Sequence, residues 1–454
     1  MRHPRLAGVL AVAARRWVFW LEPILLASAV ACFPSICPHP QSRTSSKPAT
    51  AQQETAPASP QRLFNSAQEA MGRKDYASAV TALKELLKTA PDAPAVWFNL
   101  GYAYTGLRQY QQAVQAYQKT VNLKPDLYAA RLNLGILLVN LKHADEAFEQ
   151  IQKAESLKPG DPKVHLFAGR ALTLEGKQAD AEKEFREALK LDPHLAVAQY
   201  NLGQLYLSEK RFADANSAFN KAATLNPSLP GLRLDMAVAL EGLNQASQAA
   251  TVLEQYLAQN PGDYQARSRL ARIEMQQGDN RKALDNLLLV LKSNPDFPGL
   301  NVRLGDVYAL LKKFPESEKY YRQALATMSA QPDLHRALGQ TLLEEQKFPE
   351  AEAEFRAALK RDPHNVDAAK GLAASVYFEK RYADAIPILE ALLKTPNPPV
   401  GYYFFLATCF DHLRALPQAL DAYQRFVQLT SNKTSDQAWQ AEQRIKLIRH
   451  ELRK

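Results

Sequence analysis

The sequence contains only three cysteines in 454 residues, Cys32, Cys37 and Cys409. So few cysteines cannot form a disulfide framework, and packing must therefore stabilise the fold. Because Cys409 lies inside a helical pattern, we expect it to pack as a small apolar residue.

The sequence also lacks the short motifs that carry common enzyme chemistry. It has no phosphate-binding P-loop, no GxGxxG, no GxSxG and no HExxH. Its nine histidines are scattered, and no set of histidines, cysteines and acids has the spacing of a metal site. We therefore expect no catalytic residue, no cofactor and no metal, and we predict that the chain is not an enzyme.

Strong charge is missing as well. The formal charge is +9, and the segment 1–32 contributes four arginines against one glutamate. The remainder is only mildly basic, which argues against nucleic acid as a partner.

What the sequence does contain is a spaced pattern of apolar and small residues. Trp97, Leu100, Gly101 and Tyr104 share one face of a helix, because side chains three or four apart lie together. Ala113 and Tyr117 do the same on a second helix, which ends before a proline at position 125. A pair of helices this short cannot bury its own apolar face, so it needs neighbours of the same kind.

The pattern returns at a constant interval along the chain, the one that separates Gly101 from Gly135. A column of small residues contains Ala67, Gly101, Gly135, Gly169, Gly203, Ala237, Ala271, Gly305, Gly339, Ala373 and Ala407. A second small column contains Ala79, Ala113, Ala147, Ala181, Ala215, Ala249, Ala283, Ser317, Ala351, Ala385 and Ala419. A large apolar column contains Leu83, Tyr117, Ile151, Phe185, Phe219, Leu253, Leu287, Tyr321, Phe355, Leu389 and Tyr423. Polar or glycine turns such as Lys74-Asp75 and Gly278-Asp279 separate the two helices of a unit.

This pattern resembles the tetratricopeptide repeat (TPR), whose period is about 34 residues. The resemblance implies an all-α, right-handed superhelical solenoid of helix-turn-helix units. We assign eleven units to residues 60–433 and a capping helix to residues 434–454, in which Trp439, Ile445 and Ile448 offer apolar contacts. Positions are counted below from the first residue of each unit, so that Pro60 and Pro94 are both at position 1.

The segment that precedes Pro60 differs from the repeats. Residues 1–32 combine arginines with an apolar stretch that ends in small residues, as in a signal peptide or a membrane anchor. Ala29-Val30-Ala31-Cys32 is a loose lipobox, which makes Cys32 a candidate for lipidation. Residues 33–59 are rich in Pro, Ser, Thr and Gln, and we expect a disordered linker there. The membrane would be contacted only through the N-terminal segment.

The TPR resemblance places ligand contacts on the first helix of each unit, at positions 2, 5, 6, 9, 12 and 13. At position 6 stand Asn65, Asn99, Asn133 and Asn201, and asparagine can bond both the N–H and the C=O of an extended peptide. The alternative is that these asparagines cap or solvate their helices.

Two other groups on first helices are candidates. Arg269, Arg272 and Arg303 could receive a carboxylate or a phosphate, or could form a solvated surface neutralised by nearby acids. Phe404 and Phe405 could anchor a partner, or could pack against the capping helix.

These observations predict a non-catalytic scaffold or adaptor that binds protein or peptide partners. The alternative is an accessory subunit of an envelope enzyme system, for glycan assembly or peptidoglycan turnover. The leader predicts an exported protein, periplasmic or associated with the cell envelope, and the same segment could supply a lipid anchor or a helical anchor.

Overall fold

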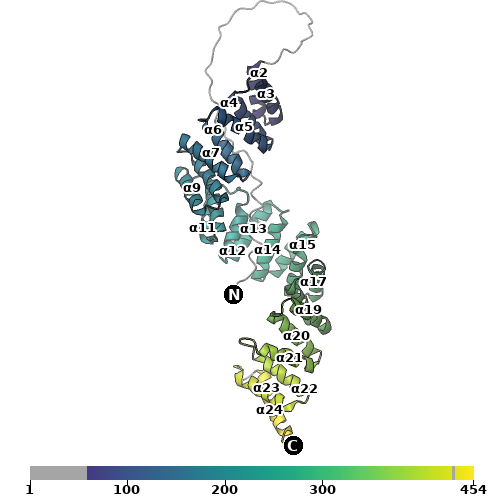
Figure 1. Ribbon diagram of the computed structural model, residues 1–454. Helices are drawn as coiled ribbons and strands as arrows, with labels where there is room; N and C mark the ends of the chain where they lie inside the picture. Colours follow the sequence, from purple (N-terminus) through teal and green to yellow (C-terminus); the bar gives the residue numbers. More distant parts are fainter. Residues whose placement is uncertain (1–58, 432–434, 454) are drawn as a thin grey trace, which may run out of the picture. The chain divides into compact units, whose positions relative to one another are not determined.

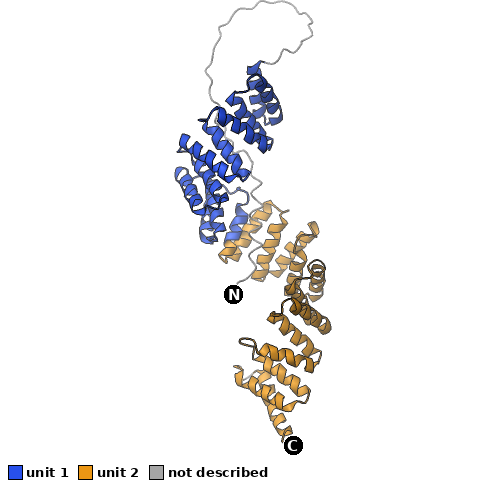
Figure 2. Cartoon of the chain, viewed as in Figure 1, with its two compact units in different colours: residues 1–239 blue, residues 240–454 orange. Residues whose placement is uncertain are grey.

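The computed structural model describes residues 59–431 and 435–453, and the regular structure in these ranges is entirely α-helical (Figure 1). The predicted leader, Cys32 and all but the last residue of the predicted linker lie outside these ranges. The chain divides into two compact units, unit 1 (Met1–Ala239) and unit 2 (Leu240–Lys454), which Figure 2 colours separately.

Unit 1 consists of helical hairpins. Its helices are α2 (Pro60–Gly72), α3 (Tyr76–Thr89), α4 (Pro94–Gly106), α5 (Tyr110–Leu123), α6 (Tyr128–Asn140), α7 (Ala144–Leu157), α8 (Pro162–Leu174), α9 (Gln178–Leu191), α10 (Ala196–Ser208), α11 (Phe212–Leu225) and the start of α12 (Leu232–Gly242). The first helices α2, α4, α6, α8 and α10 begin at equal intervals in the sequence, as the period predicts.

Unit 2 repeats the same hairpin. Its helices are α13 (Ala246–Gln259), α14 (Tyr264–Gln277), α15 (Asn280–Ser293), α16 (Leu300–Leu310), α17 (Phe314–Thr327), α18 (Pro332–Glu344), α19 (Phe348–Arg361), α20 (Val366–Phe378), α21 (Tyr382–Leu393), α22 (Gly401–His412), α23 (Leu416–Leu429) and α24 (Asp436–Glu451). The predicted all-α solenoid of helical repeats is therefore the observed fold. Within the described ranges, no helix combines the length and the apolar character that crossing a bilayer requires.

Every hairpin turns at position 15 through a left-handed residue. Two of these residues are glycines, Gly176 and Gly278, and the others include Lys74 at φ 59° and Lys142 at φ 65°. A left-handed residue after the first helix ends that helix and turns the chain back, which explains why polar residues and glycine recur at this position.

The three sequence columns form the core, as predicted. All eleven side chains of the column of Ala113 are inaccessible to solvent, and those of the column of Tyr117 are buried throughout. The glycines of the first small column make room for these large side chains. A Cβ atom added to Gly101 would lie 2.9 Å from the ring of Tyr117, and one added to Gly203 would lie 2.5 Å from the ring of Phe219.

The capping helix α24 packs with one face on the last hairpin. Ala438, Ala441, Ile445 and Ile448 join a buried cluster that includes residues of α23, so the predicted contacts of Ile445 and Ile448 are confirmed. Trp439 was wrongly expected to pack there, because its side chain is 62% exposed. It follows buried Ala438 by one residue, or about 100° around the helix, and so faces away from the cluster.

Candidate functional site

Some first helices of successive hairpins contact one another within each unit, for example α6 with α8 and α14 with α16. We call the side chains at positions 6 and 9 of the first helices the A-surface. Three of the four candidate asparagines reach this surface in unit 1. Asn65 is exposed on α2, and Asn99 and Asn133 are half-buried on α4 and α6.

Partners differ among these asparagines. Asn65 accepts a hydrogen bond from Gln61 at 3.0 Å, and Asn133 donates to the Tyr117 hydroxyl at 3.5 Å. Asn201 departs from the prediction, since it is only 7% exposed and donates to the Val197 carbonyl one turn earlier, at 2.8 Å. Its amide N–H is thus used inside α10, which leaves Asn65, Asn99 and Asn133 on three consecutive first helices, with Asn99 and Asn133 as the half-buried pair.

A residue that the sequence reasoning missed lies next along the A-surface of unit 1. Arg170 on α8 donates to the Asn140 side chain at 3.1 Å, and its guanidinium carbon lies 5.2 Å from the Phe167 ring centre. Burial lowers the pKa of Arg170 to about 10. Position 9 alone could have pointed to this residue, but its neighbours in space could not be read from its neighbours in sequence.

Acidic and aromatic side chains follow on α10 and α12. The Tyr200 hydroxyl and the Gln204 amide donate to the same carboxylate oxygen of Asp235, at 2.8 and 3.0 Å. Tyr200, Gln204 and Asp235 stand at positions 5, 9 and 6 of two consecutive hairpins. The A-surface of unit 1 therefore changes from amides through a cation to an acid.

In unit 2, two of the candidate arginines share one carboxylate. Arg269 and Arg272 on α14 donate to the two oxygens of Glu241, the former at 2.5 Å. The Glu241 side chain is mostly buried, whereas those of Arg269 and Arg272 are about a quarter and two fifths exposed. The prediction of a surface neutralised by nearby acids fits this pair better than that of an open anion site.

The third candidate arginine, Arg303, donates its hydrogen bond to a backbone carbonyl. Arg303 on α16 is half-buried and donates to the Pro298 carbonyl at 3.2 Å. Burial lowers the pKa of Arg303, and the positive charge of Arg272 adds to this effect, while Asp306 opposes it.

The two candidate phenylalanines pack against other aromatic rings, Phe404 within its own hairpin and Phe405 against the preceding hairpin. Phe404 lies 5.3 Å from Phe426 and 5.9 Å from Tyr423, both on α23, and Phe405 lies 5.1 Å from Tyr377 on α20. Phe404 also borders the cluster that α24 completes. Structural packing therefore accounts for both rings, although they remain half-buried.

Side chains at position 4, the column of Trp97, make a recurring contact with the turn that precedes their hairpin. The Trp97 ring donates to the carbonyl of Pro91, six residues earlier, at 2.6 Å. Arg131 and Arg267 make the same contact to Pro125 and Pro261, and each also donates to a side chain 19 residues later. Trp97 thus holds the turn that precedes its hairpin, and the two arginines connect that turn to both helices of their hairpins, so these contacts serve the fold.

The buried acid Glu274 predicts that the stability of the protein depends on pH. Glu274 on α14 is 4% exposed, and Asn286 donates to both of its carboxylate oxygens, at 3.1 and 2.9 Å. Burial raises the pKa of Glu274 above its ordinary value and outweighs the opposing hydrogen bonds from Asn286. Glu274 therefore binds its proton more tightly in the folded state than in the unfolded state. The free energy of unfolding falls as pH rises from the ordinary pKa of a glutamate towards the raised pKa of Glu274.

We expect Glu274→Gln to remove this dependence. The free energy of unfolding of the original protein, minus that of the variant, should decrease as pH rises from about 4 to 7, because only the original protein must bury a charge. Urea denaturation at several pH values measures this difference. Glu442→Gln, at an exposed position of α24, is the control and should give a flat difference; a flat difference for Glu274→Gln would contradict the account.

The cysteine and histidine side chains with the potential to react have structural roles. Cys409 is buried, and burial raises the pKa of its thiol to about 12, which keeps the thiol protonated and unreactive at neutral pH. His165 and His335 pair with Glu184 and Glu354 of their own hairpins. Among the described residues, no group of three or more potential ligands could hold a metal ion.

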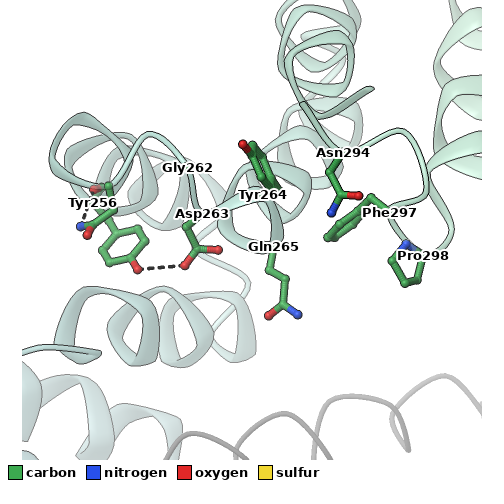
Figure 3. Close-up of a pocket in the computed structure, with 9 residues that line it drawn as sticks. Tyr256, Gly262, Asp263, Tyr264, Gln265, Asn294, Phe297 and Pro298 are labelled. Carbon is green, nitrogen blue, oxygen red and sulfur yellow. Dashed lines mark hydrogen bonds between the residues drawn. The ribbon is translucent and has the colours of Figure 1, made fainter. Parts of the chain in front are cut away.

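A pocket of about 620 Å³ opens in unit 2 at two consecutive turns that connect one hairpin to the next (Figure 3). Tyr264, Phe297 and Pro298 contribute apolar surface. Asp263 accepts from the Tyr256 hydroxyl at 2.9 Å and caps α14 through the Ala266 N–H, so its carboxylate serves the turn. The sequence did not indicate this pocket, which lies away from positions 6 and 9.

Comparisons with known proteins agree on the repeat. A family model described as the cilia and flagella-associated protein 70 C-terminal domain matches residues 66–294, half of the chain. The tetratricopeptide repeat model matches residues 268–333, 336–399 and 379–433. No curated protein matches the chain.

Solved structures are similar at low identity. MamA from Desulfovibrio magneticus RS-1 is 22% identical, with a TM-score of 0.36, over 38% of this chain and 99% of that one. PilW, a type IV pilus biogenesis factor, is 21% identical with a TM-score of 0.41, over 45% of this chain and 94% of its own. Yeast Tom70 is 13% identical with a TM-score of 0.33, over 87% of this chain and 96% of its own.

Proposed function

Because the chain belongs to the tetratricopeptide repeat family, we propose that it is a protein-interaction scaffold that holds extended segments of partner proteins on the A-surface of unit 1. The supporting observation is the pair Asn99 and Asn133, half-buried at position 6 of consecutive first helices. An asparagine amide can donate to a peptide carbonyl and accept from a peptide N–H, so repeated asparagines hold a backbone without reading its sequence.

The proposal is tested by binding of unstructured peptides. Pools of random ten-residue peptides, fluorescently labelled, are titrated with the whole protein, and the double variant Asn99→Ala/Asn133→Ala is compared with it. Each net hydrogen bond contributes about 1 kcal/mol, so affinity should fall by roughly tenfold or more. Asn122→Ala, at an exposed position of the second helix α5, is the matched control. Equal affinity of all three proteins would exclude the asparagine pair as the binding feature.

We further propose that the scaffold is exported and acts at the cell envelope, as residues 1–32 predict. If Cys32 is lipidated, cells expressing the protein should incorporate radiolabelled palmitate into it, and Cys32→Ser should abolish the label. Fractionation of the same cells gives the location. Recovery of both proteins in the cytoplasm, without label, would contradict this proposal.

A further inference from the structure

Arg170 is a cation that lacks an acidic partner in the part of the chain that the structure describes. Within the described residues, its guanidinium donates to the neutral Asn140 side chain, and its Nε–H is buried without a partner. Phe167 covers part of the guanidinium. Burial is the cause of its lowered pKa, whereas a carboxylate nearby would have raised it.

The same position in unit 2 shows what is missing. Arg272 is also at position 9, and Glu241, 31 residues earlier at position 12, supplies its carboxylate. The residue 31 positions before Arg170 is Val139, which is buried and apolar. Within residues 59–431 and 435–453, one of two equivalent arginines is thus neutralised and the other has no counter-ion.

An arginine in this state favours an anionic ligand. Removing a charge from water without a charged partner costs free energy, and part of that cost is recovered when a carboxylate pairs with the guanidinium. The planar guanidinium presents adjacent donors that match the two oxygens of a carboxylate. Asn140 fixes one edge of the guanidinium, and Phe167 restricts its tilt.

We infer that Arg170 is the anchor for a carboxylate of the segment bound on the A-surface of unit 1, an inference that rests on the proposed peptide binding. The carboxylate can come from the C-terminus of the segment or from an Asp or Glu side chain. Arg170 sets the register of the segment, whereas Asn99 and Asn133 hold its backbone.

Three peptide pools separate these sources. The first has a free C-terminus and no Asp or Glu, the second has an amidated C-terminus and one central Glu, and the third has an amidated C-terminus and a central Gln. All are titrated with the whole protein at constant ionic strength. We expect the first or the second pool to bind about tenfold more tightly than the neutral third pool.

Variants assign that preference to Arg170. Arg170→Met should remove the preference while the third pool binds as before, and Arg170→Lys should retain part of it. Arg186→Met, on the second helix α9, removes an equivalent charge elsewhere and should leave the preference unchanged. Circular dichroism of each variant shows whether it is folded.

Val139→Glu provides a test that keeps the arginine. By analogy with Glu241, the new carboxylate should pair with Arg170 and compete with the ligand, so the preference should disappear, whereas Val139→Gln should retain it. Equal binding of all three pools by the original protein would overturn the inference and leave the proposed function intact. A preference that survives Arg170→Met would do the same, and absence of binding to every pool would defeat both.

Discussion

Replacing Phe355 by alanine is expected to lower the free energy of unfolding of unit 2 by about 3–5 kcal/mol. Phe355 on α19 is inaccessible to solvent. Cβ atoms added to Gly339 and Gly371 would lie 3.0 Å and 2.1 Å from its ring, so the ring fits between the glycines of two successive hairpins. Its removal leaves a cavity that touches both the hairpin and its neighbour.

The unfolding transition of Phe355→Ala is also expected to differ in shape from that of the original protein. In a repeat array, stability is approximately a sum of hairpin terms and nearest-neighbour terms, and Phe355→Ala weakens both at one place. Urea denaturation followed by circular dichroism should therefore show a lower midpoint and a broader or divided transition. Phe378→Ala, an exposed phenylalanine on α20, should cost much less. Similar losses for the two variants would show that the glycine-lined site contributes little.

Replacing Gly203 by leucine is expected to destabilise unit 1 by about 1–3 kcal/mol through overpacking. The added Cβ would lie 2.5 Å from the Phe219 ring, and Phe219 is itself inaccessible to solvent. The ring cannot move away without disturbing the neighbouring hairpins, so the expected loss exceeds the gain of about 1 kcal/mol that leucine brings as a better helix former.

The matched control for this substitution is Gly72→Leu at the end of α2. No atom lies within 4 Å of a Cβ at that glycine, so only the conformational effect remains. Thermal unfolding of the two variants separates steric from conformational effects. If Gly203→Leu were as stable as the original protein, the small column would not determine how closely the two helices of a hairpin approach.

The sequence predicted the repeating part of the fold well. A fixed period requires each column to have the same environment in every hairpin, so the burial of Ala113 or Tyr117 could be extended to their equivalents. The left-handed turn residues followed for the same reason. Trp439 lay beyond the last repeat, where no column could indicate which face of α24 would be buried.

The candidate site was harder to predict, because its chemistry depends on which side chains meet. The sequence placed Arg269 and Arg272 on first helices, but their pairing with Glu241 required positions in space. Arg170 escaped notice because its distinguishing property is a missing partner. Asn201 has the same residue type and position as Asn133, yet its amide bonds its own helix.

The first helices of unit 1 are proposed to bind an extended segment. Hydrogen–deuterium exchange of the whole protein, with and without a tight-binding peptide from the pools, tests this claim most directly. Local opening should slow in the helices that contact the segment. We predict increased protection in α4, α6 and α8, with the second helices α5, α7 and α9 nearly unchanged. Protection confined to the second helices, or to the turns around the pocket at Tyr264 and Phe297, would contradict the claim.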